Sequence, residues 1–321
     1  MSAPRVSIVC PSYNATGTIR ATIRSVLAQT FEDFELIVVD DGSSDDTPEI
    51  VAGFAAEDPR VKLIVQENAG TAGARNRGIQ ESSGEMIAII DNDDLWLPRY
   101  LEAVTAALER TPSAGLCHTD AWILDDRNGR VHRKTAVEWP PPRPSTMDAA
   151  RLRSELLRGN FIMASSVTMT RPALEAAGEF DTSPGVRGSD DWDLWLRIAE
   201  AGFGAVRPAG VLAVYRERPD SVSRNHVLMM KSANAVATAA LQRDSSDPQS
   251  TAAARKLIEH TGREIATGTS ASPFVKLHLR IRRRVGAWVR RILRPRNWWA
   301  PPAPLRALLD DVEPGRWQRH S

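Results

Sequence analysis

The chain has 321 residues, of which 42% are hydrophobic and 25% are charged, and its formal net charge is +1. This composition excludes a disordered or a fibrous protein, and the length provides for one large domain or two smaller ones. Cys10 and Cys117 are the only cysteines, too few for a disulfide framework or a cysteine zinc site, so we expect a reducing, cytoplasmic compartment.

The first part of the chain alternates short apolar runs with helical patterns. Strands are predicted at residues 6–10, 36–39, 61–65 and 87–90. Helices are predicted at about 18–29, from 47 onward with Thr47 as its cap, and from the small-residue loop 68–76 to about residue 84. This alternation predicts an α/β fold with a doubly wound, mainly parallel sheet and helices on both faces.

The fourth predicted strand ends in the acidic sequence D-N-D-D at 91–94. In an extended chain Asp91 and Asp93 point to the same side, and ligands of such sheets bind outside the carboxyl ends of the strands. Since like charges repel unless a cation lies between them, the pair predicts a site for a divalent metal ion and a diphosphate. The alternative is a polar turn in which Asp93 or Asp94 caps the helix after Pro98.

The second part of the chain continues the alternation less regularly. In chain order the pattern predicts a helix at 98–109, a strand at 115–124, an irregular segment at 125–145, a strand at 161–170, a helix at 171–177 ended by Gly178, a helix from 189, a strand at 211–215 and two helices within 226–268. A long irregular segment inside a compact domain is usually functional or disordered, and we assign 125–145 to the side of the molecule that binds a second, acceptor substrate.

Seven motifs occur in an order and spacing that resemble a family 2 glycosyltransferase of the GT-A fold, over roughly residues 5–225. They are S-I-V-C-P-S-Y-N at 7–14, V-V-D-D-G-S-S-D-D-T at 38–47, N-A-G-T-A-G-A-R-N at 68–76, D-N-D-D at 91–94, N-F-I-M-A-S-S-V at 160–167, G-E-F-D at 178–181 and D-D-W-D-L-W-L-R at 190–197. The resemblance implies transfer of a sugar from a nucleotide-sugar, most often a UDP-sugar, to a saccharide or lipid-linked glycan acceptor. It also implies a divalent cofactor, Mn2+ or Mg2+, and inversion at the anomeric carbon.

The resemblance assigns residues near the first two strand ends to the nucleotide. Asp41 would accept hydrogen bonds from the base or the ribose; its alternative role is to cap the turn at 42–43. Pro11 would fix the backbone of the neighbouring loop. Tyr13 would offer its ring to a uracil, although plain packing explains it as well.

The loop 68–76 resembles a phosphate cradle, because glycine lets the backbone approach a ligand and a helix N-terminus favours anions. Arg75 would be an always-charged donor near the nucleotide; the alternative is an ion pair with a structural aspartate. Asn92 and Asp190 complete the set assigned to the nucleotide-sugar.

Asp191 is the predicted catalytic base, since the second member of the family's acidic pair removes the proton of the acceptor hydroxyl. The alternative is that Asp190, Asp191 and Asp193 are merely first-turn acids of a helix. The metal ion is predicted on Asp93, with Asp91 nearby, where it would stabilise the leaving diphosphate.

The chain departs from the family pattern after the Tyr-Arg pair at 215–216. Many relatives place a histidine where this chain has Arg218, which puts a third protein ligand of the metal in doubt. His226 follows further on and could substitute as the ligand; the alternative, which we favour, is a solvent-facing histidine. Arg218, Ser221 or Arg224 would instead close over the donor phosphates as part of a lid.

We divide the chain into a GT-A domain at 1–225, with a nucleotide-binding half at 1–97 and an acceptor half at 98–225, and a helical extension at 226–321. Nine of the 41 basic residues and no acidic residue lie within 274–299, whose apolar residues recur at helical spacing. This basic segment predicts contact with an anionic membrane and a peripheral position on the inner face of the plasma membrane; the alternatives are packing on the domain and dimerisation.

The N-terminal residues show no hydrophobic segment of signal-peptide length, and no apolar run approaches the roughly 18 residues of a membrane span, so we expect no membrane-spanning segment. We expect no nucleic acid partner, because no binding module is recognisable. Two other functions stay open from the residues alone: a non-catalytic sugar-nucleotide binding or scaffold protein, and a nucleotidyltransferase, which would release pyrophosphate rather than a nucleoside diphosphate.

Overall fold

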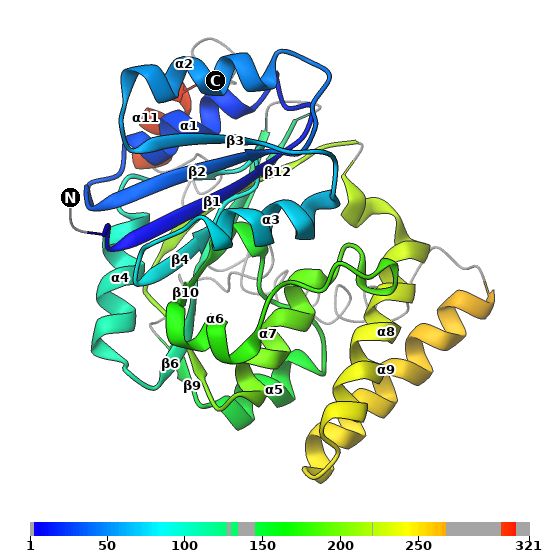
Figure 1. Ribbon diagram of the computed structural model, residues 1–321. Helices are drawn as coiled ribbons and strands as arrows, with labels where there is room; N and C mark the ends of the chain where they lie inside the picture. Colours follow the sequence, from blue (N-terminus) through cyan, green and yellow to red (C-terminus); the bar gives the residue numbers. More distant parts are fainter. Residues whose placement is uncertain (1–2, 127–129, 134–144, 220, 268–302, 313–321) are drawn as a thin grey trace, which may run out of the picture.

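The computed structural model describes residues 3–126, 130–133, 145–219, 221–267 and 303–312 (Figure 1). The basic segment 274–299 and much of the predicted irregular segment 125–145 lie outside these residues. Figure 1 shows a central sheet with helices above and below it and a helical hairpin at one side.

The main sheet has eight strands in the order β3-β2-β1-β4-β10-β6-β11-β9. Strands β1 to β4 are mutually parallel, whereas β10 is antiparallel to β4 and β6, and β9 is antiparallel to β11. The predicted α/β class with a mainly parallel sheet is therefore confirmed. The strands are β1 Val6–Ser12, β2 Phe34–Asp40, β3 Val61–Val65, β4 Met86–Ile89, β6 Ala114–His118, β9 Ser145–Met147, β10 Val167–Thr170 and β11 Gly204–Arg207.

Both faces of this sheet are buried, which explains the apolar runs of its central strands. Ile8 and Cys10 of β1 belong to one apolar core, and Val9 between them belongs to another. The first core includes residues of α1 Ile19–Leu27, α2 Thr47–Glu57 and α4 Tyr100–Arg110. The second includes residues of α5 Ala149–Leu156, α6 Arg171–Ala177 and α7 Asp190–Glu200, and α3 Gly70–Gln80 packs on β1 and β2.

A second sheet of four strands lies beside the first, in the order β5-β12-β7-β8. Its strands are β5 Leu95–Trp96, β7 Asp120–Asp125, β8 Arg130–Arg133 and β12 Val211–Glu217. The single strand predicted at 115–124 is wrong, because the chain changes sheets at Thr119. There the backbone N–H donates to the Ser166 carbonyl at 3.1 Å, and β7 then pairs with β12 instead of with β10.

Three local predictions need correction. Most of the predicted loop 68–76 is helical, since α3 already begins at Gly70, whose φ of 79° belongs to the left-handed region that glycine tolerates. The strand predicted at 161–170 covers only Val167–Thr170, after a 3-10 turn at Ala164–Ser166. Thr47 is the first residue of α2 rather than its cap, and its hydroxyl donates to Asp45 Oδ1 at 2.5 Å.

The two helices predicted within 226–268 are confirmed as α8 His226–Arg243 and α9 Pro248–Thr267. Val236 and Ala240 of α8 share the core of α7, so this hairpin packs on the residues before 225. The division of the chain at residue 225 stays a prediction.

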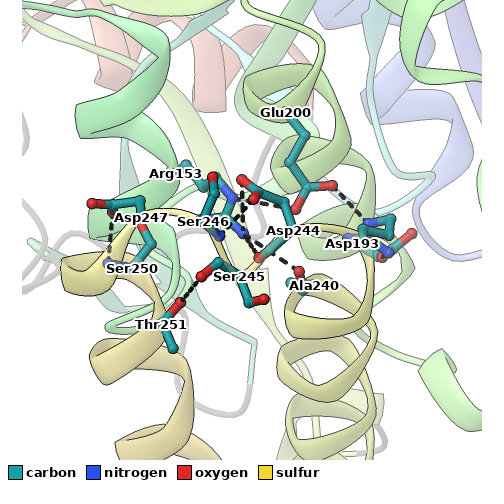
Figure 2. Close-up of polar contacts among 11 residues, drawn as sticks. Arg153, Asp193, Glu200, Ala240, Asp244, Ser245, Ser246, Asp247, Ser250 and Thr251 are labelled. Carbon is teal, nitrogen blue, oxygen red and sulfur yellow. Dashed lines mark hydrogen bonds and ion pairs between the residues drawn. The ribbon is translucent and has the colours of Figure 1, made fainter.

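An ionic network fixes the hairpin where α8 ends (Figure 2). Arg153 on α5 donates to the Asp244 carbonyl at 2.6 Å and pairs with Glu200 on α7 at 3.4 Å. Arg243 reaches Glu200 at 2.6 Å and Asp193 at 3.0 Å. We call the residues Arg153, Asp193, Arg197, Glu200, Arg243 and Asp244 the junction cluster.

A last described helix, α11 Ala303–Val312, returns to the N-terminal part of the chain. Its buried Leu305, Leu308 and Leu309 pack with Ala21 of α1 and Leu95 of β5. Within the described ranges no helix combines the length and the apolar character that crossing a bilayer requires.

Candidate active site

The acidic sequence at 91–94 forms a turn at the carboxyl end of β4, and neighbouring elements hold its backbone. The Asp91 N–H donates to Ser165 Oγ at 3.1 Å, and the Asp93 carbonyl accepts from Arg216 Nε at 2.8 Å. Asp94 Oδ1 accepts from the Arg216 backbone N–H at 2.8 Å. Neither Asp93 nor Asp94 caps α4, whose cap position is taken by Arg99 with no side-chain hydrogen bond. Arg216 and Ser165 thus hold the backbone of this turn, and none of these bonds uses the carboxylates of Asp91 and Asp93.

The carboxylates of this turn repel one another. Burial raises the pKa of Asp93 to about 6, the charge of Asp91 adds to the rise, and the Arg218 guanidinium opposes it. Burial and the charges of Asp93 and Asp91 also raise the pKa of Asp94 well above its usual value. Such an excess of negative charge is typical of a place where a cation binds.

Arg75 connects this turn to the predicted base. It lies on α3 with a buried side chain, and its guanidinium pairs with Asp91 Oδ1 at 2.8 Å and with Asp190 Oδ2 at 2.7 Å. Its carbon Cζ also lies 5.3 Å from the ring centroid of Phe180, which Asn76 holds by two hydrogen bonds. The observed contact is therefore an ion pair with aspartates, but both aspartates belong to the predicted site.

Asp190 and Asp191 begin α7 directly after a tight turn at Gly188, where φ is 85°. Of the three first-turn acids, Asp190 pairs with Arg75 and Asp193 pairs with Arg197 at 2.8 Å. Asp191 is partly exposed, and it is the member of the three without an ion pair to any described residue; its Oδ1 accepts from the Trp192 N–H at 2.7 Å. Burial and the neighbouring Asp190 raise the pKa of Asp191 to about 7 against the opposing charge of Arg75.

Asp41 lies at the carboxyl end of β2 and holds the start of α3. Its Oδ1 accepts from Gln66 Nε2 at 2.7 Å and the Ala69 N–H at 2.8 Å, and its Oδ2 accepts from the Gly70 N–H at 2.9 Å. Since a carboxylate offers about four acceptor positions, one position on Oδ2 is left for a ligand. The turn at 42–43 is capped instead by Asp40, which accepts from the Ser43 N–H and Oγ.

The remaining residues predicted to bind the donor lie at the same edge of the sheet. Pro11 is buried near the end of β1, Tyr13 after it is 51% exposed, and Asn92 is partly exposed in the acidic turn. Strands β2, β1 and β4 are adjacent and parallel, so their carboxyl ends bring Asp41, Pro11 and Asp91 to one edge. Arg216 and Ser165 were missed, because their contribution is to hold backbone across the chain and has no local sequence signal.

Within the described residues no group of three or more His, Cys, Asp or Glu side chains is arranged as a metal site. The Asp91 and Asp93 carboxylates are nevertheless hard oxygen donors of the kind that Mg2+ and Mn2+ accept. Arg218, which stands where many relatives place a histidine, has its Nη1 3.8 Å from Asp93 Oδ2. His226 lies instead near Glu264 on α9, at 3.7 Å.

Comparisons with known proteins show the family to which the chain belongs. The model of the family "Glycosyl transferase family 2" matches residues 7–171. The chain is 51% identical over 228 residues to the UDP-Glc:alpha-D-GlcNAc-diphosphoundecaprenol beta-1,3-glucosyltransferase WfgD of Escherichia coli, which covers 70% of this chain and 82% of that protein.

Solved structures share the fold at low sequence identity. Residues 1–349 of TarS from S. aureus, in complex with UDP-GlcNAc, give a TM-score of 0.63 at 17% identity over 80% of this chain and 72% of that one. The mannosyltransferase PcManGT of Pyrobaculum calidifontis, in complex with GDP-Man and Mn2+, gives 0.59 at 20% identity over 97% and 88%. The family match and the extent of the identity to WfgD show that this chain belongs to glycosyl transferase family 2 and is a glycosyltransferase.

Proposed function

We propose that the chain transfers a sugar from a UDP-sugar to a hydroxyl of a lipid-linked saccharide, with inversion and with a divalent metal ion. The observation that carries the proposal is the Asp190–Arg75–Asp91 bridge, with contacts of 2.7 and 2.8 Å, because it brings the start of α7 beside the acidic turn. A displacement reaction needs a base for the incoming hydroxyl and a charge-stabilising site for the leaving group in one place.

The donor and the acceptor are inferred from relatives. WfgD is named for a UDP-Glc donor and a GlcNAc-diphosphoundecaprenol acceptor, and the 51% identity extends over 82% of that protein. The TarS complex with UDP-GlcNAc adds a UDP-sugar on the same fold. Both support UDP as the nucleotide, and WfgD supports a saccharide diphosphate on a lipid as the acceptor.

Asp191 is proposed as the base. It is partly exposed, without an ion pair to any described residue, and its pKa is raised to about 7, so that it can take a proton near neutral pH. The anomeric carbon would be attacked by the acceptor oxygen as Asp191 Oδ2 takes the hydroxyl proton, and the bond to the UDP oxygen breaks on the opposite side. One such displacement inverts the anomeric configuration.

Asp93 and the Oδ2 of Asp91 would hold Mn2+ or Mg2+. Burial and, after it, the charge of Asp91 raise the pKa of Asp93 to about 6, so a cation beside the two carboxylates would be favourable. A bound ion there supplies charge stabilisation for the departing diphosphate. Arg75 keeps Asp91 oriented through its Oδ1, and Asp190 keeps Arg75 in place. The remaining position on Asp41 Oδ2 would receive the nucleoside, and Pro11, Tyr13 and Asn92 lie at the same edge of the sheet.

Membrane association is proposed on the sequence of 274–299 alone, which carries nine basic residues and no acidic one. Contact with the membrane fits a lipid-linked acceptor, because the enzyme must reach a substrate at the membrane surface. With it we propose a peripheral position of the enzyme at the cytoplasmic face of the membrane.

The test uses release of UDP from a panel of UDP-sugars, with lipid-linked saccharides as acceptors and Mn2+ or Mg2+ present. Asp191→Asn should lower kcat by on the order of 10²–10⁴-fold, while UDP still binds, because general-base catalysis is lost but the nucleotide site is intact. Glu175→Gln, on the exposed surface of α6, is the control. Wild-type turnover by Asp191→Asn would show that Asp191 is not the base. Wild-type protein that binds UDP but turns over no donor would favour the non-catalytic alternative, and release of pyrophosphate would favour a nucleotidyltransferase.

A further inference from the structure

The carboxyl ends of β6 and β11 carry a histidine and an arginine that the proposed function does not use. His118 ends β6, Arg207 ends β11, and the two strands pair in parallel next to each other. The ring of Phe161, in the segment before β10, lies edge-to-face on the His118 ring, with 5.6 Å between the centroids. We call His118, Phe161 and Arg207 the β6–β11 cluster.

This cluster lies on the face of the sheet that α7 covers. Side chains alternate across a strand, so His118 shares the side of Leu116. In the same way Arg207 shares the side of Ala205, which is opposite Leu116 in register. Leu116 and Ala205 belong to the second apolar core together with residues of α7, and Phe161 packs against that core. The cluster and the helix that begins with the proposed base are therefore on one side of the sheet.

The cluster also lies at the same edge of the sheet as the acidic turn. His118 pairs with Val167 of β10, which pairs in turn with Ile89 at the end of β4. Neighbouring strands are about 4.8 Å apart, so the end of β6 lies about 10 Å from the end of β4. In the strand order, β1 and β2 with the proposed nucleotide residues lie on one side of β4, and the cluster lies on the other. A group bound at the cluster would thus lie beyond the leaving diphosphate, where the acceptor must approach.

The polar atoms of the cluster have unused hydrogen-bonding capacity. His118 is only 5% exposed, and neither of its ring nitrogens makes a hydrogen bond to a described residue. Burial and, after it, the charge of Arg207 lower the pKa of His118 to about 3, so the ring is uncharged near neutral pH. Arg207 Nε is enclosed and also has no hydrogen-bond partner among the described residues. Because buried polar groups nearly always have such a partner, this concentration of unused capacity indicates a ligand site.

The donors and acceptors of the cluster indicate the kind of ligand. An uncharged imidazole presents one N–H donor and one nitrogen acceptor, which hydroxyl and amide groups can satisfy, whereas a diphosphate only accepts. Arg207 Nη1 also lies 3.7 Å from Asp120 Oδ2, so part of its charge is already balanced. Both facts favour an uncharged polar ligand over an anion. The Phe161 ring beside these groups suits the apolar face of a sugar ring.

We propose that His118, Phe161 and Arg207 bind the saccharide of the lipid-linked acceptor, with its hydroxyl or acetamido groups hydrogen-bonded to the imidazole and to Arg207 Nε. The proposal rests on the proposed function, because it takes the acceptor to be a saccharide diphosphate on a lipid. The cluster then determines the affinity for the acceptor sugar, and binding of the UDP-sugar does not depend on it.

Substitutions in the cluster should change acceptor binding alone. His118→Phe keeps an aromatic ring but loses both nitrogens, and the KM for the acceptor should rise by about fivefold to tenfold. Arg207→Gln loses a charged donor and should raise this KM by about tenfold or more. The KM for the UDP-sugar should stay within about twofold of wild type, because a raised KM for one substrate alone reports lost binding of that substrate.

The experiment uses N-acetylglucosamine diphosphate on a short lipid as the acceptor, with UDP release to measure both KM values. Calorimetry in the presence of UDP and Mn2+ measures binding of the same acceptor and of the lipid diphosphate without the sugar. His118→Gln, which keeps polar atoms on a smaller side chain, is a second variant in case His118→Phe does not fold. Arg151→Gln is the matched control, because Arg151 is an exposed cation on α5. It should leave every measurement within about twofold of wild type.

Both cluster substitutions should weaken binding of the sugar-bearing lipid and leave binding of the sugar-free lipid unchanged. Unchanged affinity for the sugar-bearing lipid would overturn the proposal. An equal loss for the sugar-free lipid would mean that the cluster binds the diphosphate, and an equal rise of both KM values would mean that it serves the fold; either result would also overturn it.

A failure of the proposed function gives a different result. Wild-type protein that binds the sugar-bearing lipid but turns over no UDP-sugar would contradict the proposed function, while weaker binding by His118→Phe would still support the cluster. Normal turnover by wild type, with wild-type acceptor affinity in both cluster variants, would reject the cluster alone. Wild-type protein that binds no sugar-bearing lipid would overturn both proposals.

Discussion

Helix α7 takes part in two ionic clusters that differ in their charge balance. The junction cluster contains three arginines and three carboxylates, so its charges balance. They are Arg153, Arg197 and Arg243, and Asp193, Glu200 and Asp244. The strand-end cluster has more acids than bases, as Asp91, Asp93, Asp94, Asp190 and Asp191 against Arg75, Arg216 and Arg218.

The difference separates a structural use of charge from a functional one. Buried charges that are paired within the protein hold elements together, whereas uncompensated ones cost stability and persist where a ligand brings the missing charge. Asp191 and Asp193 are two residues apart on one helix turn and fall on opposite sides of this division. In the proposed function, the charge environment rather than the residue type distinguishes the role of Asp191 from that of Asp193.

The largest expected effect comes from a change at Arg75, which belongs to the strand-end cluster and pairs with two of its carboxylates. Arg75→Lys keeps the charge but loses the two-pronged contact with Asp91 and Asp190, so kcat/KM should fall by about 100-fold. Steady-state UDP release measures this effect. Arg77→Lys is the control, because Arg77 lies on the same helix in an exposed pair with Glu81. Activity of Arg75→Lys within twofold of wild type would mean that the bridge does not position the site.

The junction cluster should respond in stability and not in turnover. Arg243→Gln leaves Asp193 and Glu200 with one arginine fewer, and because Arg243 is only 31% exposed the free energy of unfolding should fall by about 1–2 kcal/mol. Urea denaturation measures the loss. Arg158→Gln removes an exposed pair with Glu155 and should cost less than about 0.5 kcal/mol. A fall in kcat of the still-folded Arg243→Gln protein beyond about threefold would show that the two clusters are not separate.

The smallest effect is a pH-dependent change of stability with opposite signs for neighbouring acids. The pKa of Asp191 is raised to about 7 in the folded protein, so its contribution to stability is present below its unfolded pKa and is lost as pH rises through about 7. Asp191→Asn should therefore raise the melting temperature at pH 8 by roughly 2–4 °C, which corresponds to about 1 kcal/mol, and should raise it less at pH 5.

Asp193→Asn should lower the melting temperature at pH 8, because it removes the ion pairs with Arg197 and Arg243. Scanning calorimetry of both variants at the two pH values gives the comparison directly. The same sign for both variants at pH 8 would contradict the assignment of Asp191 to an uncompensated site.

The sequence predicted the strand ends that carry the candidate site. Apolar runs buried on both faces locate β1, β2 and β4, and their carboxyl ends carry Asp41, Asp91 and Asp93. Helix α6 and the stop at Gly178, whose φ is 81°, were also predicted, because glycine signals the left-handed end of a helix.

What could not be predicted depends on contacts between distant residues. The switch of sheets at Thr119 follows from pairing with β10 and β12, and neither partner is visible in a local pattern. Arg75 lies 115 positions before Asp190 in the chain, so a sequence motif can suggest a charged donor but not which carboxylates it bridges. The hydrogen bonds of Asp41 to the start of α3 show the same limit, since the carboxylate predicted to bind the nucleotide also holds the start of this helix.

The return of α11 to the N-terminal part changes how the basic segment should be studied. Leu305, Leu308 and Leu309 cover Ala21 and Leu95, so a chain truncated before residue 303 would bare an oily patch against α1 and β5. Such a fragment would bind vesicles and aggregate through this exposed apolar surface, independently of the basic residues of 274–299. Charge reversal at 282–284 in the 321-residue chain should leave the packing of α11 intact, and it therefore tests the proposed attraction to anionic lipid alone.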